Sequence, residues 1–499
     1  MAELAFENTF VRDLPADPVT DNVPRQVSGA SYTRVQPTPV AAPRLLAWSE
    51  DLGGQLGLQP TPQTIEVLAG NRVLPGMQPY AARYGGHQFG HWAGQLGDGR
   101  AITLGEVVAR DGSRQELQLK GAGRTPYSRT ADGRAVLRSS LREFACSEAM
   151  HSLGVPTTRA LSLVATGEQV VRDMFYDGNP APEPGAVVCR VAPSFLRFGN
   201  FQIHAARNEP ALLKQLVDYA IRNFYREKSY EQFFHEICAR TARLMVDWMR
   251  LGFVHGVMNT DNMSILGLTI DYGPYGWLEG FDTQWTPNTT DAPTLRYTYG
   301  NQAGIAQWNL ARLAEALMPL IPEDKLADGL TLYADTFQSG WNQAIAAKLG
   351  LRAVPDELAT GLFRALAAAE TDFTIFFRNL AVEDPSIDAL RPAFYADRPA
   401  DDPLATWLGA YREKLKEEAV GPRQRIEEMK RANPRYVFRN YLAVQAIEAM
   451  EQGDASVLER LMRVLRRPYD EQPENEDLAA RRPDWARDRA GCSALSCSS

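Results

Sequence analysis

Two oxygen-bearing side chains, Asn262 and Asp271, stand nine residues apart near the middle of the chain. Magnesium takes one or two protein oxygens together with water and phosphate oxygens, so this pair could hold the metal beside a triphosphate. Asp261 directly precedes Asn262 and could accept the proton of an attacking hydroxyl group. Taken singly, each of the three could equally cap a turn or the end of a strand. Their chemistry therefore depends on the spacing around them.

That spacing matches a protein-kinase catalytic loop in all but one position. In such a loop, a His is followed two residues later by the catalytic Asp and seven residues later by a metal-binding Asn. Asn262 stands seven residues after His255, but Val257 takes the position of the base and cannot accept a proton. Asp271 opens an Asp-Tyr-Gly triplet that resembles the metal-binding D-F-G triplet. The sequence thus predicts a metal site without the usual base, and Asp261 is the candidate to replace it.

The elements before this loop occur in the order of a kinase small lobe. Residues 85–100 are dense in glycine and could approach phosphate. Residues 101–108 are expected to form a strand, and residues 116–120 the returning strand after an Asp-Gly turn. A helix is expected over residues 134–153, where apolar residues recur on one face.

Lys120 is the only lysine before Lys214 in a chain rich in arginine. A compact ammonium group is not interchangeable with a guanidinium at a tight phosphate site, so Lys120 is a candidate phosphate ligand. Either Glu143 or Glu148 on the following helix could orient it: Glu148 lies on the apolar face, and Glu143 lies nearer the middle of the helix.

Two arginines, Arg190 and Arg197, stand seven residues apart around a predicted strand at residues 187–191. Guanidinium groups suit bidentate phosphate binding, but a pair of surface salt bridges is an equal alternative from the sequence alone.

The rest of the chain is predicted to be helical, and one of these helices leads directly into the His255 loop. We therefore expect an α+β, protein-kinase-like fold of two lobes, with a small β-rich N-lobe and a large helical C-lobe. The predicted divisions are an N-terminal arm (1–44), the N-lobe (45–200), the C-lobe (201–465) and a mobile C-terminal tail (466–499). Helices are expected at residues 211–225, 230–251, 302–318, 325–349, 357–369, 404–418 and 437–451, and a short strand pair at 265–270.

Composition excludes several classes of protein. A net charge of −8 argues against nucleic-acid binding. No apolar run approaches the roughly 18 residues of a membrane span, and the N-terminus lacks a signal-peptide pattern. We expect a monomeric, cytoplasmic protein. Five cysteines are too few for a disulfide scaffold, but Cys492 and Cys497 share a small, polar C-terminal segment and are candidate redox residues.

The residues above match a known family. The chain resembles the selenoprotein O family, kinase-like proteins that transfer AMP to hydroxyl groups of other proteins. The resemblance extends over nearly the whole chain and rests on residues 84–90, 97–100, 119–129, 132–138, 255–263, 271–274, 433–436 and 496–499.

The resemblance implies a nucleotide bound in reverse, with the γ-phosphate buried and the α-phosphate facing the acceptor. A Ser, Thr or Tyr hydroxyl of a client protein would attack the α-phosphorus and release pyrophosphate, with Asp261 as the base. Asn262 and Asp271 would bind Mg²⁺ or Mn²⁺, and Glu143 rather than Glu148 would pair with Lys120. The nucleotide-binding residues implied are Gly97, Gly99, Arg100, Lys120, Asp132, Gly133, Arg190, Arg197 and Asp271.

The family resemblance also implies a role in redox or oxidative-stress regulation. Eukaryotic relatives carry selenocysteine near the C-terminus, where this chain has Cys497. Residues 282–291 contain no cysteine, and Pro287 stands where some relatives have one, so a disulfide between the tail and this segment is not expected. A Cys492–Cys497 bridge and two free thiols both stay open.

Two alternatives compete with AMP transfer. One is an ordinary kinase that uses Asp261 as its base, which Val257 disfavours. The other is a nucleotide-binding scaffold without activity, which the presence of Lys120, Asn262 and Asp271 disfavours.

Overall fold

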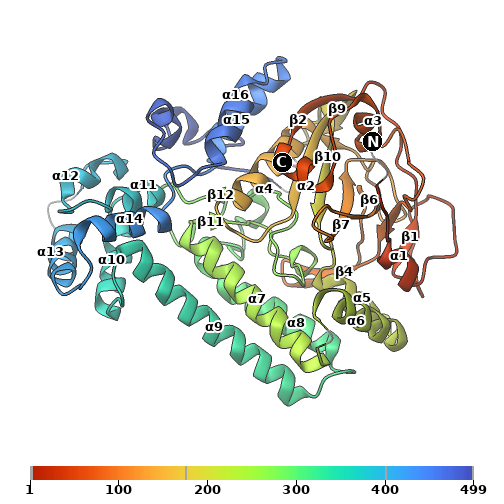
Figure 1. The fold of residues 1–499 in the computed structure, drawn as a ribbon, viewed down its shortest axis with the longest axis horizontal. Helices are drawn as coiled ribbons and strands as arrows, with labels where there is room; N and C mark the ends of the chain where they lie inside the picture. The colour runs from red at the N-terminus through yellow and green to blue at the C-terminus, as the bar shows by residue number, and fades with distance from the viewer. Residues whose placement is uncertain (1–3, 175–176, 227, 399–401, 497–499) are drawn as a thin grey trace.

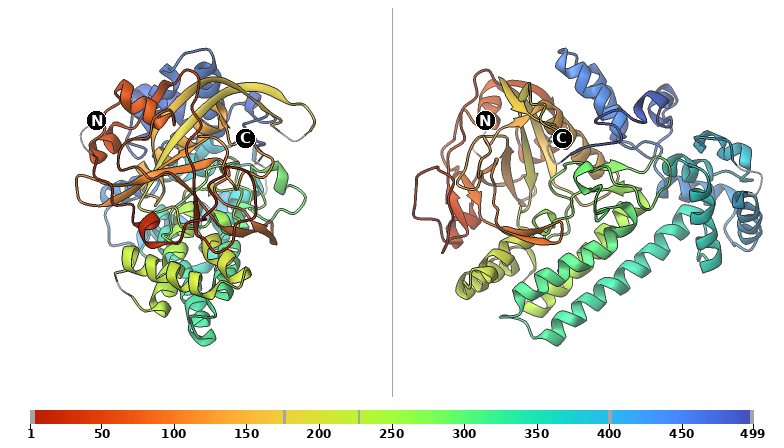
Figure 2. Two further views of the ribbon diagram at one scale, coloured as in Figure 1. Left: turned by 90° about the vertical axis from the view of Figure 1, so that its right-hand side faces the viewer. Right: turned by 180° about the vertical axis from the view of Figure 1, so that it is seen from behind.

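The computed structural model describes residues 4–174, 177–226, 228–398 and 402–496. An antiparallel sheet occupies the N-terminal part and helices make up most of the C-terminal part (Figure 1). The α+β division into a β-rich N-lobe and a helical C-lobe agrees with the sequence prediction, and Figure 2 shows the same division from two other sides.

The sheet of the N-lobe has the strand order β1-β3-β6-β7-β10-β9-β2, and β8 pairs with β10 beside this path. All of these pairs are antiparallel. The predicted strand that ends at Lys120 is β7, in the middle of the sheet. The strands are β1 (Tyr32–Arg34), β2 (Arg44–Trp48), β3 (Tyr80–Ala82), β6 (Ala101–Val108), β7 (Arg114–Lys120), β8 (Ala135–Val136), β9 (Arg159–Arg172) and β10 (Ala181–Ala192).

Helices cover both faces of this sheet. Successive side chains of a strand point to opposite faces. On β10, Val187 and Cys189 join the core under α2 (Glu50–Leu56) and α3 (Pro62–Leu68), whereas Ala186 and Val188 join the core under α4 (Leu137–Ser152). Because both faces are apolar, the central strands are firmly held, and the ends of β7 and β10 can carry charged groups into the cleft.

The C-lobe is organised around α7 (Tyr230–Arg250), which lies beside α8 and α9 (Figure 1). Ser229 caps α7, because its hydroxyl accepts a hydrogen bond from the Gln232 amide. The helix ends immediately before β11 (Phe253–Val254), which pairs with β12 (Gly276–Trp277). The predicted catalytic loop lies between these two short strands and contains the 3₁₀ turn Thr260–Asn262.

The other helices of the described chain follow the predicted pattern in part. They are α5 (Phe198–Ala206), α6 (Pro210–Phe224), α8 (Gln302–Leu317), α9 (Glu323–Leu349), α10 (Asp356–Ala368), α11 (Phe373–Asn379), α12 (Ile387–Leu390), α13 (Pro403–Lys416), α14 (Pro422–Ala432), α15 (Asn440–Glu451) and α16 (Ser456–Leu465). Helix α6 matches the helix expected at residues 211–225, and α8, α9, α10, α13 and α15 match the five expected from residue 302 onward. The remaining helices were not predicted.

The structure corrects the expected strand pair at residues 265–270. This stretch makes isolated bridges instead: Thr269 pairs with Thr157, and Ser264 just before it pairs with Arg197. The hairpin that closes the loop is formed by β11 and β12 on either side of it. The N-terminal arm also does more than extend, since it forms α1 (Thr9–Asp13) and supplies the edge strand β1.

Residues 466–496, which were expected to be mobile, are folded against the rest of the chain in the structure. Helices α15 and α16 pack on α4 of the N-lobe, and the chain beyond them folds into short 3₁₀ turns. Leu495 pairs with Asn288, and the Ser496 hydroxyl donates to the Met174 carbonyl. The proline and charged residues of this segment suggested disorder, but Arg482, Arg487 and Arg489 form ion pairs with glutamates of the C-lobe. Among the described helices, none has the length and hydrophobicity needed to cross a membrane.

Candidate active site

A cleft of about 610 Å³ lies where the sheet of the N-lobe meets the catalytic loop. The structure brings nearly all of the predicted site residues to its walls. Arg197 and Glu143 lie directly behind this wall, both buried. The predicted residues that line the cleft are Gly97, Gly99, Arg100, Lys120, Asp132, Gly133, Arg190, Asp261, Asn262 and Asp271.

Lys120 is oriented by Glu143. The Lys120 ammonium lies 2.5 Å from one Glu143 oxygen, and the other oxygen accepts a hydrogen bond of 2.9 Å from Arg190. Burial lowers the pKa of Lys120, and the Glu143 charge opposes this shift. Glu148 is buried too, but it binds Arg159 at 2.6 Å on another side of the helix. Residues five apart on a helix point in different directions, so one of the two glutamates reaches the cleft and the other does not.

Asp271 is surrounded by cations. Its two oxygens accept hydrogen bonds from Arg190 and from Arg197, the latter at 2.5 Å, and the Lys120 ammonium lies 3.9 Å away. Burial opposes ionisation of Asp271, but the Arg197, Arg190 and Lys120 charges hold its pKa well below the usual range. The carboxylate is therefore charged at neutral pH, as a metal ligand must be.

The backbone before Asp271 is held by His255. The His255 ring donates a hydrogen bond of 2.9 Å from Nε2 to the Ile270 carbonyl and stacks on Trp248. Asp271 itself has a φ of 58°, a left-handed conformation that is uncommon for residues other than glycine. Such strained positions persist where the surrounding structure fixes them, often at functional sites.

Asp261 has the features expected of a base. Its side chain is buried beside the cleft, Gln88 donates to one carboxylate oxygen at 3.3 Å, and the other, Oδ1, has no hydrogen-bond partner among the described residues. Burial raises the pKa of Asp261 to about 6, against the opposing charge of Arg197. The group is thus mostly ionised at neutral pH and has one oxygen able to accept a proton.

The glycine-dense stretch has two roles in the structure. Its first part forms a hairpin of β4 (Gly85–Gln88) and β5 (His91–Gln95) that lies on the catalytic loop. The His87 amide donates to Thr260 at 2.7 Å, and the Phe89 amide donates to Asn259 at 3.2 Å. The second part, residues 96–100, lines the cleft. Gln88, which sequence reasoning missed, contacts the candidate base from this hairpin.

The donor atoms near Asn262 fit a hard divalent cation. The Asn262 amide group donates to the Val257 carbonyl at 2.9 Å, which leaves its oxygen for other partners. Together with the Asp271 carboxylate, this gives an oxygen-only set of the kind that Mg²⁺ and Mn²⁺ prefer. The described residues contain no cluster of three or more His, Cys, Asp or Glu side chains that would suit a different metal.

The outer rim of the cleft is positively charged. Asp132 accepts hydrogen bonds of 2.7 and 2.8 Å from Arg172, so its carboxylate is already paired. Arg129, Arg134 and Arg172 also line the cleft, and sequence analysis did not single them out. Next to Asp132, Gly133 has a φ of 74°, and a Cβ there would lie 2.2 Å from the Gly123 backbone.

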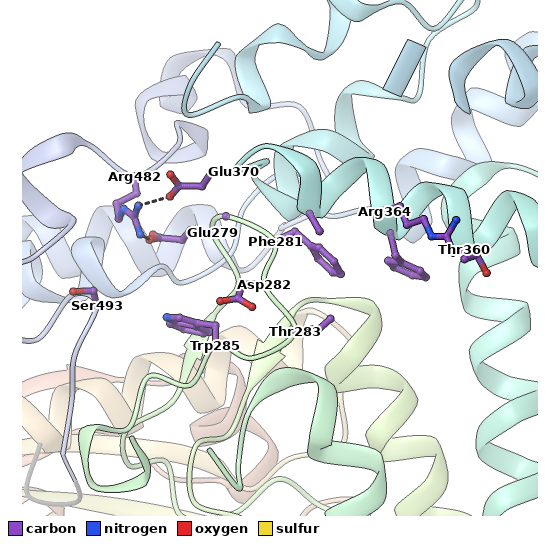
Figure 3. A pocket seen from close by; sticks show the side chains of 13 residues that line it. Glu279, Phe281, Asp282, Thr283, Trp285, Thr360, Arg364, Glu370, Arg482 and Ser493 are labelled. Carbon is purple, nitrogen blue, oxygen red and sulfur yellow. Dashed lines mark hydrogen bonds and ion pairs between the residues drawn. The ribbon is translucent and has the colours of Figure 1, made fainter. Parts of the chain in front are cut away.

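A second cavity, of about 750 Å³, contains none of the predicted site residues (Figure 3). Residues 279–285, α10 and the C-terminal segment form its walls. Arg482, from the C-terminal segment, joins the other two walls, because it donates hydrogen bonds to Glu279 at 3.0 Å and to Glu370 at 2.9 Å. Three carboxylates, Glu279, Asp282 and Glu370, line this cavity, but two of them are paired with Arg482. The predicted phosphate and metal ligands line the cleft instead.

The candidate redox pair is described only in part. Cys492 is buried as a free thiol, and burial raises its pKa to about 11, which makes it a poor nucleophile. Cys497 lies outside the described residues, so a Cys492–Cys497 bridge stays a prediction.

Comparisons with known proteins agree with the sequence resemblance. The sequence model of one family, described as "Protein adenylyltransferase SelO", matches residues 21–466. A protein of Nitrosospira multiformis named "Protein nucleotidyltransferase YdiU" is 60% identical, over 99% of this chain and 96% of its own. A protein of Aromatoleum aromaticum with the same name is 58% identical over 100% of both chains.

One solved structure is a distant match. It is ROP2 of Toxoplasma gondii, described as a virulence factor with a protein-kinase fold and no enzymatic activity. It is 13% identical over 79% of this chain and 84% of its own, with a TM-score of 0.24, too low an overlap to bear on function. The family match and the two close relatives are decisive by themselves: this chain belongs to the SelO family.

Proposed function

We propose that the chain transfers AMP from ATP to a Ser, Thr or Tyr hydroxyl of client proteins and releases pyrophosphate. The printed names of the family and of its close relatives support nucleotidyl transfer to protein. The observation that carries the proposal is Asp261, a buried carboxylate with an unpaired oxygen beside Asn262, in a loop where apolar Val257 takes the position of the kinase base.

The proposed reaction uses these groups in order. Asp261 accepts the proton of the acceptor hydroxyl, whose oxygen forms a bond to the α-phosphorus while the bond from that phosphorus to pyrophosphate breaks. Positioning and charge stabilisation supply most of the catalysis in such transfers. Lys120, Arg190 and Arg197 carry three positive charges against the two carboxylates of Glu143 and Asp271, which leaves net positive charge to offset pyrophosphate.

Asn262 and Asp271 would hold Mg²⁺ or Mn²⁺, and the cation would neutralise phosphate charge when bound. Gly97, Gly99, Arg100, Asp132 and Gly133 would line the rest of the nucleotide. The proposal also includes the setting that the family resemblance implies, a cytoplasmic, monomeric enzyme whose clients belong to redox or oxidative-stress responses.

Label position in ATP tests this proposal. The purified chain is incubated with Mg²⁺ and ATP labelled at either the α- or the γ-phosphorus, and label bound to protein is measured. We expect protein-bound label from α-labelled ATP alone, because AMP retains the α-phosphorus.

Each of the two competing functions gives a different pattern. Label from γ-labelled ATP alone would show a kinase that uses Asp261 as its base and would overturn AMP transfer. ATP binding without label on any protein would favour the non-catalytic scaffold.

A further inference from the structure

The hairpin that contacts Asp261 presents its other face to a cluster of aromatic and arginine side chains. Neighbouring residues of a strand point to opposite faces. On β4, Gly86 and Gln88 face Asp261, because a Cβ at Gly86 would lie 2.6 Å from its Oδ1 and Gln88 donates to its Oδ2. His87 points away and lies 5.1 Å from the Trp92 ring and 5.5 Å from the Trp308 ring.

Two guanidinium groups stack on Trp308. Arg296 lies 4.6 Å and Arg312 lies 5.1 Å from the centre of the indole. Arg312 has an acidic partner, Glu315 at 2.6 Å, whereas Arg296 forms no ion pair with any described residue. The Nε and Nη2 atoms of Arg296 are buried without a hydrogen-bond acceptor in the described chain. Buried donors without an acceptor cost folding energy, and the charge of Arg296 has no acidic partner among the described residues.

Asp291, five residues before Arg296, does not serve as that partner. Asp291 is buried, and its oxygens accept hydrogen bonds from Thr294 and from the backbone amides of Arg296 and Tyr297. The charge of Asp291 is therefore used to shape the turn that presents Arg296.

This cluster reaches the edge of the cleft at the side of Asp261. Tyr297 follows Arg296, and its hydroxyl donates to Asn259 at 2.7 Å and accepts from the Phe89 amide at 3.0 Å. Asn259 and Phe89 both line the cleft. Trp92 and Leu295 are 39% and 40% exposed, although both are large and apolar. Exposed aromatic residues beside arginine are the composition of protein-binding hot spots.

We propose that this aromatic–arginine surface, formed by His87, Trp92, Arg296, Trp308 and Arg312, binds the client polypeptide next to its acceptor hydroxyl and selects Asp or Glu there. The inference rests on the proposed AMP transfer and adds a class of substrate to it. An acidic side chain of the client would neutralise the Arg296 charge, which no described carboxylate pairs with, and the adjacent backbone of the client would lie over Trp92 and Trp308. The acceptor hydroxyl would then reach Asp261 from across the hairpin.

Three matched peptides test the inference. Each carries one Ser acceptor, flanked by Glu in the first, by Gln in the second and by Lys in the third, and AMP transfer is followed with α-labelled ATP. We expect kcat/KM to fall in the order Glu, Gln, Lys. Arg296→Gln together with Arg312→Gln should lower kcat/KM for the Glu peptide by roughly tenfold, as loss of two interfacial charge contacts does, with the KM for ATP unchanged.

Charge reversal gives a sharper test than charge removal. Arg296→Glu should shift the preference toward the Lys peptide, a result that a merely destabilised protein would not give. Arg423→Gln is the matched control, since Arg423 is 96% exposed on α14, far from the hairpin, and should leave all three rates unchanged (Figure 1). Thermal unfolding of each variant checks that it is folded.

The two proposals fail in different ways. Equal transfer to all three peptides, or no effect of the arginine variants, would overturn the client surface and leave AMP transfer intact. Label on other proteins but on none of the peptides would also count against the surface. No transfer of α-label to any acceptor would overturn the proposed function, and the client surface with it.

Discussion

At Asp261, burial and charge act against each other. Removal from water favours the protonated carboxyl, while Arg197 favours the ionised form, and the resulting pKa of about 6 lies close to neutral pH. A base is most effective when its pKa is near the working pH. Asp271, only ten residues further along the chain, is partly exposed and adjoins three cations, so its pKa moves in the opposite direction. Two aspartates of the same loop region thus receive different chemical tasks from their neighbours.

The pKa of Asp261 predicts the pH dependence of AMP transfer. The base must be ionised, so the rate should rise as pH increases from 5 to 7.5, with its midpoint near pH 6. The measurement is initial rate at saturating ATP and Mg²⁺. Asp261→Asn should lose about 10²- to 10⁴-fold in kcat, keep its affinity for ATP, and show no step near pH 6. If the rate of this variant still changed near pH 6, the group that titrates there would not be Asp261.

The same shift predicts a change in stability. The folded-state pKa of Asp261, about 6, lies above its ordinary value of 3.8, so the contribution of Asp261 to stability is lost as pH rises through 6. Asn carries no charge to bury. Asp261→Asn should therefore raise Tm relative to the unmodified chain, and by more at pH 7.5 than at pH 5.

Among the elements, α4 decides which glutamate serves the cleft. The apolar pattern of the sequence placed a helix there, and the structure has it at Leu137–Ser152. Glu143 reaches Lys120 and Arg190, whereas Glu148 joins Arg159, Ser49 and the Ala160 amide. Helix α4 therefore carries one carboxylate that orients Lys120 in the cleft and a second that pairs with Arg159 away from it.

A matched pair of substitutions on α4 separates these two roles. Glu143→Gln removes the charge that orients Lys120, so the KM for ATP should rise and transfer should fall by at least about tenfold. Glu148→Gln should lower Tm and leave the KM for ATP unchanged. Both variants are compared by steady-state kinetics and thermal unfolding, and a rise in KM for ATP in Glu148→Gln would contradict the assignment.

The hairpin of β4 and β5 is the element closest to the candidate base. Gly86 allows this approach, since a Cβ there would lie 2.6 Å from Asp261 Oδ1. Gly86→Ala should displace the carboxylate, and a misplaced base lowers kcat by about 10²-fold without changing ATP affinity. Gly54→Ala is the control, because a Cβ at Gly54 of α2 meets no atom within 4 Å. Normal AMP transfer by Gly86→Ala would show that the position of the Asp261 carboxylate does not depend on the hairpin.

Sequence patterns predicted the elements whose signal is local. Strand β7 and helix α4 follow from alternation and from helical periodicity, and the loop from His255 to Asn262 follows from a motif. The hairpin of β4 and β5 was missed because glycines such as Gly85 and Gly86 weaken a strand signal. Here Gly85 lies against the Trp92 ring and Gly86 against the Asp261 side chain, where a Cβ would not fit. The pairing of Asp271 with Arg190 and Arg197 depends on three segments meeting in space, which no local pattern records.

For the whole molecule, the C-terminal segment completes the site from a distance. Leu495 accepts a hydrogen bond of 2.7 Å from the Thr289 amide and donates one of 2.8 Å to the Pro287 carbonyl. Asn288, between these two residues, donates at 3.0 Å to the Gly256 carbonyl in the catalytic loop. The order of residues 287–289, and of the loop beside them, therefore depends on the far end of the chain.

Truncation tests this dependence. A chain that ends at Arg466 should have a lower Tm, lower AMP transfer and faster proteolytic cleavage within residues 282–291, because the pairing with Leu495 is gone. Asp477→Asn is the control, since it removes only the surface ion pair with Arg460 at 2.6 Å and should behave as the unmodified chain does. Full transfer by the truncated chain would contradict the coupling.

The pairing of Leu495 with residues 287–289 has a consequence for the time at which activity begins. Ribosomes make proteins from the N-terminus, and folding starts while synthesis continues. Lys120, Asp261 and Asp271 are all made long before Leu495, but residues 287–289 gain this partner only after residue 495 has emerged from the ribosome. A nascent chain, or one cut short by a premature stop codon, would hold the candidate catalytic residues without this support and would modify the proteins around it more slowly.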